Sequence, residues 1–141
     1  MRGLFDTKID LLMIKDFKTW RSIKSNLHEN QVRLHFHERE IWSTTVGANI
    51  GYEQDGKGQE YLRPILVLRK FNNETLWAVF LTKKIKTGRY YFEFKSKSQD
   101  TSTANLSQLR LIDSKRLKYR VGLISEEDFM ELKKRIIGLI Q

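Results

Sequence analysis

An arginine at the entrance of an apolar strand is the residue of this sequence best suited to chemistry. Arg63 and Pro64 lead directly into the apolar residues 65–68, and such a run indicates a strand covered on both faces or a core strand of a small barrel. Because proline has no N–H to donate, it suits the first residue of a strand and places Arg63 at the rim of the core. A guanidinium there can hold a phosphate through two parallel hydrogen bonds.

A second apolar strand, predicted over residues 75–82, ends on a threonine and is followed by a basic segment. The Thr82 hydroxyl can donate a hydrogen bond to a phosphate oxygen. A polar loop punctuated by Gly51, Gly56 and Gly58 precedes Arg63. A guanidinium, a hydroxyl and a mobile polar loop are the parts needed to hold a phosphodiester.

The charge of the chain favours a polyanionic partner. Its 141 residues contain 26 Lys+Arg and 17 Asp+Glu, which gives a formal net charge of +9. A surplus of this size attracts RNA or DNA through phosphate contacts, although it is also compatible with a basic protein that merely remains soluble. Aromatic residues interleave with the cations, an arrangement that suits single-stranded nucleic acid. They are Tyr52, Tyr61, Trp77, Tyr90 and Tyr91.

Several kinds of chemistry are excluded or disfavoured by composition. The chain has no cysteine, so it has no disulfide, thiolate nucleophile or cysteine-based zinc site. His28, His35 and His37 are its only histidines, and their spacing matches no metal motif. Phosphate-loop and dinucleotide-binding patterns are also absent. We therefore expect neither a metal nor a cofactor. Without a signal peptide or a membrane-spanning run, the chain is expected to be soluble and cytoplasmic.

The amino-terminal residues predict an amphipathic helix over residues 5–28, with Asp6 as its N-cap. Apolar side chains recur there at intervals of three and four residues, so we expect this helix to pack on the main domain. They are Ile9, Met13, Phe17, Trp20, Ile23 and Leu27. Residues 1–30 are thus expected to form an N-terminal helical extension.

Residues 31–141 are predicted to form one mainly β (α+β) domain, built on a small, strongly curved sheet or barrel. Asn72 and Asn73 indicate a hairpin turn. Ser125 and Asp128 form a capping box at the start of a C-terminal helix, flanked by Ile124 and Phe129 as a hydrophobic staple. The strands are expected over residues 31–37, 39–46, 64–70, 75–82, 89–95, 104–112 and 117–121.

Two stretches resemble the PemK/MazF (Kid-like) toxin family. The first joins Gly51-Tyr52-Glu53-Gln54 to Arg63-Pro64 and to a strand that ends at Thr82. The second is the run over residues 106–117, in which Gln108, Arg110, Asp113, Lys115 and Arg116 follow one another at the spacing of the family. The resemblance extends over residues 36–141. It is weaker at Tyr52, where some members carry a histidine.

The resemblance implies a small SH3-like β-barrel with helices, a homodimer and a cognate antitoxin. It also implies a metal-independent endoribonuclease that cuts single-stranded RNA by attack of the substrate's 2′-hydroxyl, leaving 2′,3′-cyclic phosphate and 5′-hydroxyl ends. Carried over by motif, Arg63 and Thr82 are the expected catalytic pair. The expected RNA-binding residues are Gln54, Gln108 and Arg110, with Glu53 from the same loop.

Physical chemistry supports these roles but leaves the general base open. An arginine stays protonated, so Arg63 suits charge stabilisation and proton donation better than proton abstraction. Glu53 is a candidate base. Two other functions fit the same residues: a non-catalytic RNA- or DNA-binding module on the same barrel, and a protein-interaction domain for an acidic partner. The extension over residues 1–30 either covers part of the barrel or occupies the groove that an antitoxin peptide fills in relatives.

Overall fold

The two central strands are buried on both faces, as their apolar runs predict. The computed structural model describes residues 14–96 and 99–141. Strand β2 (Leu62–Lys70) and strand β3 (Thr75–Thr82) form an antiparallel hairpin. Along β2, Ile65 and Val67 point into one core cluster, whereas Leu66 and Leu68 point into another. The hairpin turn is confirmed, because the Asn72 side chain accepts hydrogen bonds from the amides of Glu74 and Thr75.

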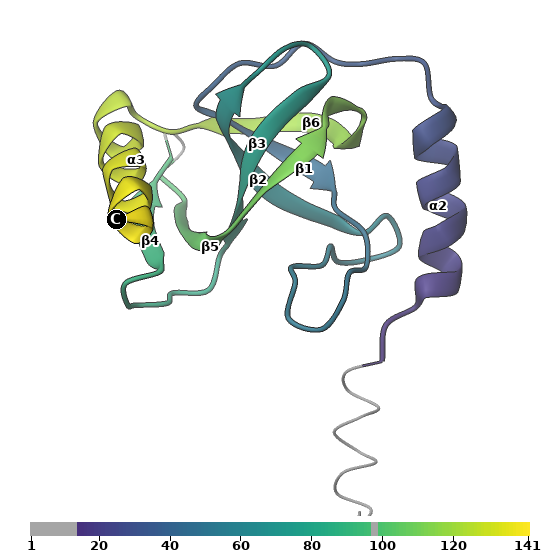
Figure 1. Ribbon diagram of the computed structural model, residues 1–141, viewed down its shortest axis with the longest axis horizontal. Coiled ribbons are helices and arrows are strands. Elements are labelled where there is room, and N and C mark those ends of the chain that lie inside the picture. The colour runs from purple at the N-terminus through teal and green to yellow at the C-terminus, as the bar shows by residue number, and fades with distance from the viewer. Residues whose placement is uncertain (1–13, 97–98) are drawn as a thin grey trace, which may run out of the picture.

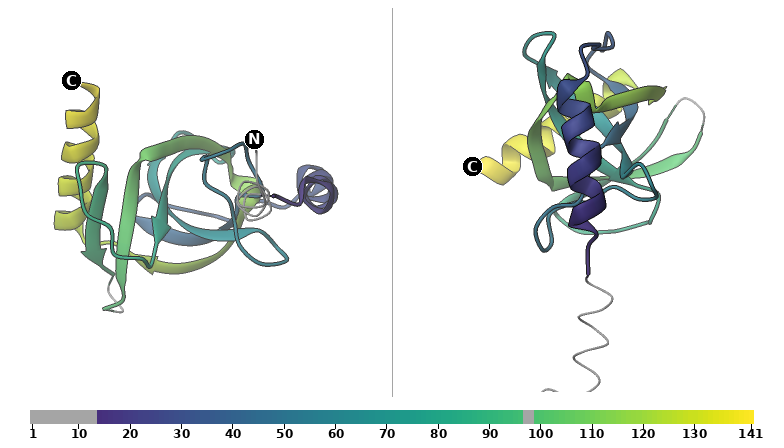
Figure 2. Two further views of the ribbon diagram at one scale, coloured as in Figure 1. Left: turned by 90° about the horizontal axis from the view of Figure 1, so that it is seen from below. Right: turned by 90° about the vertical axis from the view of Figure 1, so that its right-hand side faces the viewer.

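The strands form one strongly curved, six-stranded antiparallel sheet in the order β4-β5-β3-β2-β1-β6 (Figure 1, Figure 2). The remaining strands are β1 (Glu40–Thr45), β4 (Tyr91–Lys95), β5 (Thr101–Asp113) and β6 (Leu117–Leu123). Register shifts interrupt the β1–β6, β2–β3 and β3–β5 ladders. Such irregularities bend a strand and increase its twist, which accounts for the curvature. The expected mainly β fold is therefore confirmed.

The hydrophobic core consists of two clusters, one on each side of the sheet. The inner cluster contains Phe36, Trp42 and Phe80 within the curve of the sheet. The outer cluster lies beneath helix α3 (Glu126–Ile140), which contributes Phe129 and Leu132. This helix starts as predicted, since the Ser125 hydroxyl accepts a hydrogen bond of 3.1 Å from the Asp128 amide. None of the helices among residues 14–96 and 99–141 is long and apolar enough to cross a bilayer.

The helix predicted over residues 5–28 is interrupted within the described part of the chain. Helix α2 spans Phe17–Glu29, and its N-cap is Asp16, whose carboxylate accepts a hydrogen bond of 3.0 Å from the Thr19 amide. Residues 14–16 are not helical, and the expected cap Asp6 lies outside the described residues. Capping by Asp16 therefore sets the start of this helix at Phe17. Helix α2 lies on the opposite side of the sheet from α3 (Figure 2, left).

The predicted strand over residues 31–37 is wrong. This segment is extended but joins no ladder among the described strands. Its alternating apolar residues serve a different purpose: Phe36 fills the inner cluster, while Val32 and Leu34 are exposed. The Lys70 ammonium donates to the Phe36 carbonyl at 2.9 Å, so a side chain satisfies the backbone there instead of a neighbouring strand.

Candidate active site

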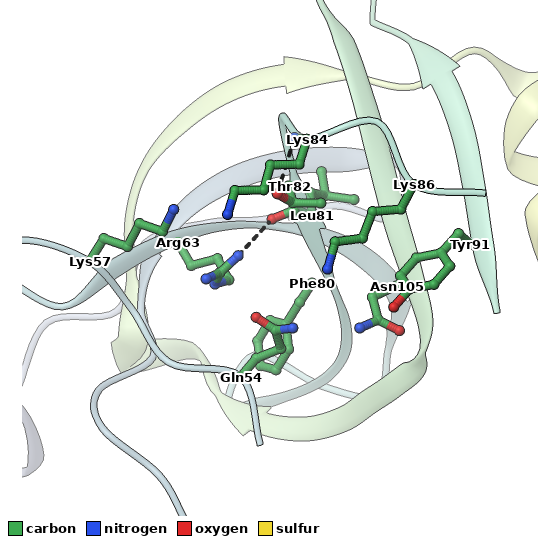
Figure 3. A pocket seen from close by; sticks show the side chains of 10 residues that line it. All are labelled: Gln54, Lys57, Arg63, Phe80, Leu81, Thr82, Lys84, Lys86, Tyr91 and Asn105. Carbon is green, nitrogen blue, oxygen red and sulfur yellow. Dashed lines mark hydrogen bonds between the residues drawn. The ribbon is translucent and has the colours of Figure 1, made fainter. Parts of the chain in front are cut away.

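The β2–β3 hairpin brings Arg63 and Thr82 together. Ile65 pairs with Phe80, and continuing this antiparallel register by two residues places Arg63 opposite Thr82. Directly opposed residues of an antiparallel pair project from the same face of the sheet. Both side chains line one pocket at the rim of the inner cluster (Figure 3).

Neutral carbonyl groups hold the Arg63 side chain in place. Its Nε donates to the Asp55 carbonyl at 2.6 Å, and its Nη1 lies 3.4 Å from the Leu81 carbonyl. Partial burial lowers the pKa of the Arg63 guanidinium, while the nearby Asp55 charge opposes the shift. A guanidinium has five N–H donors, and these two bonds leave others for a ligand. The Asp55 carboxylate itself is bound by Lys15 and by the Asn49 amide, so Arg63 does not form a simple rim salt bridge.

The Thr82 hydroxyl is oriented by the turn that follows β3. It accepts a hydrogen bond of 3.2 Å from the Lys84 amide. A hydroxyl that accepts in this way retains its own proton for donation. Thr82 therefore ends its strand and also presents a donor beside Arg63.

The pocket around this pair is strongly cationic. Lys57, Lys84 and Lys86 line it together with Arg63 (Figure 3). The Lys86 ammonium also lies 5.5 Å from the centre of the Tyr91 ring. Among the residues that the structure describes, no carboxylate side chain lines this pocket. An anion in the pocket would thus meet positive charge and N–H or O–H donors without a competing negative charge.

The other predicted site residues lie in an adjoining pocket. Glu53, Gln108 and Arg110 line it, and Gln54 and Phe80 line both pockets. The Gln108 side chain holds the loop before Arg63, because it donates to the Tyr52 carbonyl at 3.0 Å and accepts from the Gln54 amide at 3.3 Å.

Glu53 stands apart from the Arg63–Thr82 pair. Its carboxylate accepts a hydrogen bond of 2.9 Å from the Ile50 amide, which closes a turn in the loop. It lines the adjoining pocket and not the pocket of Arg63 and Thr82. The structure therefore separates this candidate base from the two residues that it was expected to assist.

Three lining residues were missed as site residues by sequence reasoning. Asn105 is a buried amide on β5 that pairs with both Phe80 and Tyr91 across the sheet. A polar residue between Ala104 and Leu106 was the available signal. Tyr91 was noted only as an aromatic residue. Lys57 reaches the pocket because an isolated bridge joins it to Leu62, and nothing in the local sequence indicates that contact.

Comparisons with known proteins identify the family of this chain. The family model of the PemK-like, MazF-like toxin of type II toxin-antitoxin systems matches residues 38–140. The chain belongs to this family. No similar sequence was found among curated proteins.

Solved structures share the fold at low sequence identity. MazF from Deinococcus radiodurans (Form-I) matches with a TM-score of 0.61 and 14% identity, over 76% of this chain and 97% of that one. A mycobacterial endoribonuclease in complex with its cognate antitoxin gives 0.57 and 13%, over 75% and 95%. Mycobacterium tuberculosis toxin MazF-mt6 gives 0.55 and 13%, over 72% and 96%.

Proposed function

We propose that this protein is an endoribonuclease toxin that cuts single-stranded RNA at a phosphodiester held between Arg63 and Thr82. One observation carries the proposal: four cationic side chains and the Thr82 hydroxyl converge on a single pocket that no carboxylate lines within the described part of the chain. This arrangement suits a phosphodiester, whose charge increases as a nucleophile attacks phosphorus. A mycobacterial endoribonuclease of the same fold supports RNA as the source of this phosphodiester.

In the proposed reaction, the RNA 2′-hydroxyl oxygen bonds to the adjacent phosphorus and the bond from phosphorus to the 5′-oxygen breaks. The hydroxyl loses its proton and the leaving oxygen gains one, so the products are a 2′,3′-cyclic phosphate and a 5′-hydroxyl. Arg63 stabilises the charge on the phosphoryl oxygens through paired N–H bonds, and Thr82 donates a further hydrogen bond. Protein cations thereby supply the charge stabilisation that a metal ion provides in other nucleases.

The adjoining pocket is proposed to hold nucleotides that flank the cut. Gln54, Gln108 and Arg110 supply amide and guanidinium donors there. The Glu53 carboxylate accepts a hydrogen bond within its own loop and lies outside the Arg63 pocket. We therefore propose that Glu53 contacts or orients the RNA and does not act as the general base. The group that accepts the 2′-hydroxyl proton is left open.

We also propose a cognate antitoxin and a homodimer. An acidic antitoxin segment would complement the net charge of +9 and compete with RNA for the cationic pocket. A mycobacterial endoribonuclease of the same fold is known in complex with its antitoxin, which supports this partner. The barrel over residues 31–141 is proposed to carry the catalytic machinery, and residues 1–30 are proposed to form an extension of it.

The test is cleavage of a long single-stranded RNA in EDTA by wild type, Arg63→Ala and Thr82→Ala. Arg69→Ala is the matched control, because Arg69 lies on the same strand, is exposed and pairs with Glu38 at 3.7 Å. We expect discrete fragments with 5′-hydroxyl ends from wild type and Arg69→Ala. Activity should fall by roughly 10²–10³ in the other two variants, as when one transition-state donor is removed. Salt-sensitive RNA binding without any product would instead indicate a non-catalytic binding module.

A further inference from the structure

The loop between β1 and β2, residues 46–61, supports the Arg63 pocket. It carries Asp55, whose carbonyl binds Arg63 Nε at 2.6 Å, and it contributes Gln54 and Lys57 to the pocket lining. The loop has little hydrophobic anchoring at its tip, where Ile50 and Tyr52 are 78% and 89% exposed. The conformation of the tip therefore depends on hydrogen bonds and ion pairs rather than on hydrophobic packing.

Lys15 supplies such a contact from the amino-terminal extension. Its ammonium donates to the carbonyls of Asn49 at 2.5 Å and Gly51 at 2.8 Å, and it lies 2.9 Å from the Asp55 carboxylate. All three acceptors belong to the β1–β2 loop, and an ammonium has three donors. The Lys15 side chain is 15% exposed, so water screens these contacts only weakly. The Asp55 carboxylate thus binds Lys15, and the Asp55 backbone carbonyl binds Arg63.

Trp20 fixes the two ends of the same loop. It is the one buried residue of α2, and its ring lies 5.5 Å from the ring of Tyr61. Gly47 has a φ of +80°, and a Cβ there would lie 2.1 Å from the Trp20 ring, so only glycine permits this close approach. The Tyr61 hydroxyl also donates to the Asp16 carbonyl at 3.0 Å.

We propose that residues 15–20 form a built-in brace that orders the β1–β2 loop and, through Asp55, sets the position of Arg63. Lys15 and Trp20 are positioning residues in this scheme, and neither lines the Arg63 pocket. The brace precedes residues 38–140, the part of the chain that the family model matches. Its effect on cleavage rests on the proposed function, whereas its effect on the loop and on Arg63 does not.

The first test measures the loop and Arg63 directly in the full-length protein. Variants Lys15→Ala and Trp20→Ala are compared with Lys18→Ala, which removes one exposed lysine from the same segment. Because a hydrogen bond to a charged group contributes measurably to local stability, backbone amides of residues 46–61 should exchange with deuterium roughly tenfold faster in the first two variants. The NMR signal of the Arg63 Nε–H should lose its protection in parallel. Amides of β3 should stay protected, which excludes global unfolding.

The second test measures cleavage by the same proteins. We expect kcat to fall severalfold in Lys15→Ala with a smaller change in KM, and Lys15→Arg to recover part of the loss. Unchanged loop exchange and Arg63 protection in both variants would overturn the brace. A loosened loop with unchanged kcat would overturn its positioning role. If wild type cuts no RNA, the proposed function fails, while the exchange data still decide whether the brace exists.

Discussion

At the scale of single residues, the chemistry of the site depends on which hydrogen-bond donors and acceptors remain unused after the structural hydrogen bonds have formed. Arg63 donates from Nε to the Asp55 carbonyl and from Nη1 to the Leu81 carbonyl. Its remaining N–H groups are available in the pocket. Thr82 accepts from the Lys84 amide and keeps its proton. One carboxylate oxygen of Glu53 accepts a hydrogen bond from the Ile50 amide. The donors that remain on Arg63 and Thr82 therefore favour these two residues as phosphate ligands, whereas one Glu53 oxygen is already occupied by a hydrogen bond.

A pair of substitutions tests the Thr82 hydroxyl. Thr82→Val keeps the shape of the side chain but removes the donor, and we expect the cleavage rate to fall by roughly 10²-fold, as on loss of one oxyanion donor. Thr82→Ser keeps the hydroxyl and should retain activity within about tenfold, the cost of a freer rotamer. Single-turnover cleavage of a fluorescent RNA measures both. Equal rates in the valine and serine variants would rule out hydrogen-bond donation by Thr82.

At the scale of elements, the segment that follows α2 is tied to the connection between β5 and β6. The short 3₁₀ helix η1 (Ser114–Arg116) joins β5 to β6, and Asp113 caps it by accepting from the Lys115 amide at 2.8 Å. Arg33, from the extended segment after α2, binds the same carboxylate at 3.0 Å. One carboxylate thus links the segment after α2 to the β5–β6 connection.

This link predicts a pH dependence of stability. Burial alone would raise the pKa of Asp113, but hydrogen bonds from the Lys115 amide and Arg33 outweigh it, so the pKa lies below the usual 3.8. A depressed pKa stabilises the fold above about pH 4, and this contribution disappears as the pH falls through the folded-state pKa. Asp113→Asn should therefore be less stable by about 0.5 kcal/mol at pH 7, as for an exposed ion pair.

Urea unfolding at pH 7 and pH 3 measures this difference. We expect the stability gap between wild type and Asp113→Asn to narrow at pH 3, because this pH lies below the ordinary carboxyl pKa of 3.8 and the unfolded state then binds more protons than the native state. Glu127→Gln, an exposed carboxylate substitution on α3, serves as the control. A gap of the same size at both pH values would show that the charge of Asp113 does not stabilise the fold.

At the scale of the whole molecule, the proposed RNA binding depends on charge at two different distances. The net charge of +9 acts over a distance comparable to the screening length, whereas the pocket lysines act at contact. Helices α2 and α3 lie on opposite sides of the sheet (Figure 1, Figure 2). Charge therefore contributes both to general attraction and to local binding.

Salt titration separates these two contributions. Each phosphate contact to single-stranded RNA adds about 0.7 to the slope of log affinity against log salt. The double variant Lys84→Gln/Lys86→Gln should therefore lower this slope by about 1.4 if each lysine contacts one phosphate. Lys133→Gln/Lys134→Gln on α3 removes the same charge and should change the slope less. Fluorescence anisotropy of a labelled RNA measures the slopes, and equal losses in both variants would place RNA elsewhere than the pocket.

The amino-acid sequence by itself determined the features that depend on neighbours in the chain. The apolar runs of β2 and β3, the Asn72 turn and the Ser125 cap all rest on contacts within a few residues, and each formed as predicted. The family motifs also identified Arg63 and Thr82, which the hairpin register then brought into one pocket.

Only the tertiary structure decided the features that depend on distant partners. Phe36 belongs to a segment whose alternating pattern predicts a strand. Both edges of β1 and β2 are already paired with other strands, so the segment joins no ladder there and Phe36 packs in the inner cluster. Lys57 reaches the pocket from the β1–β2 loop, and Asn105 reaches it from β5, which pairs with β3 across a long connection in the chain. Lys15 binds Asp55 across 40 residues of chain. Local pattern cannot specify such contacts, because they exist only once the curved sheet and the segment of residues 15–29 fix both partners in space.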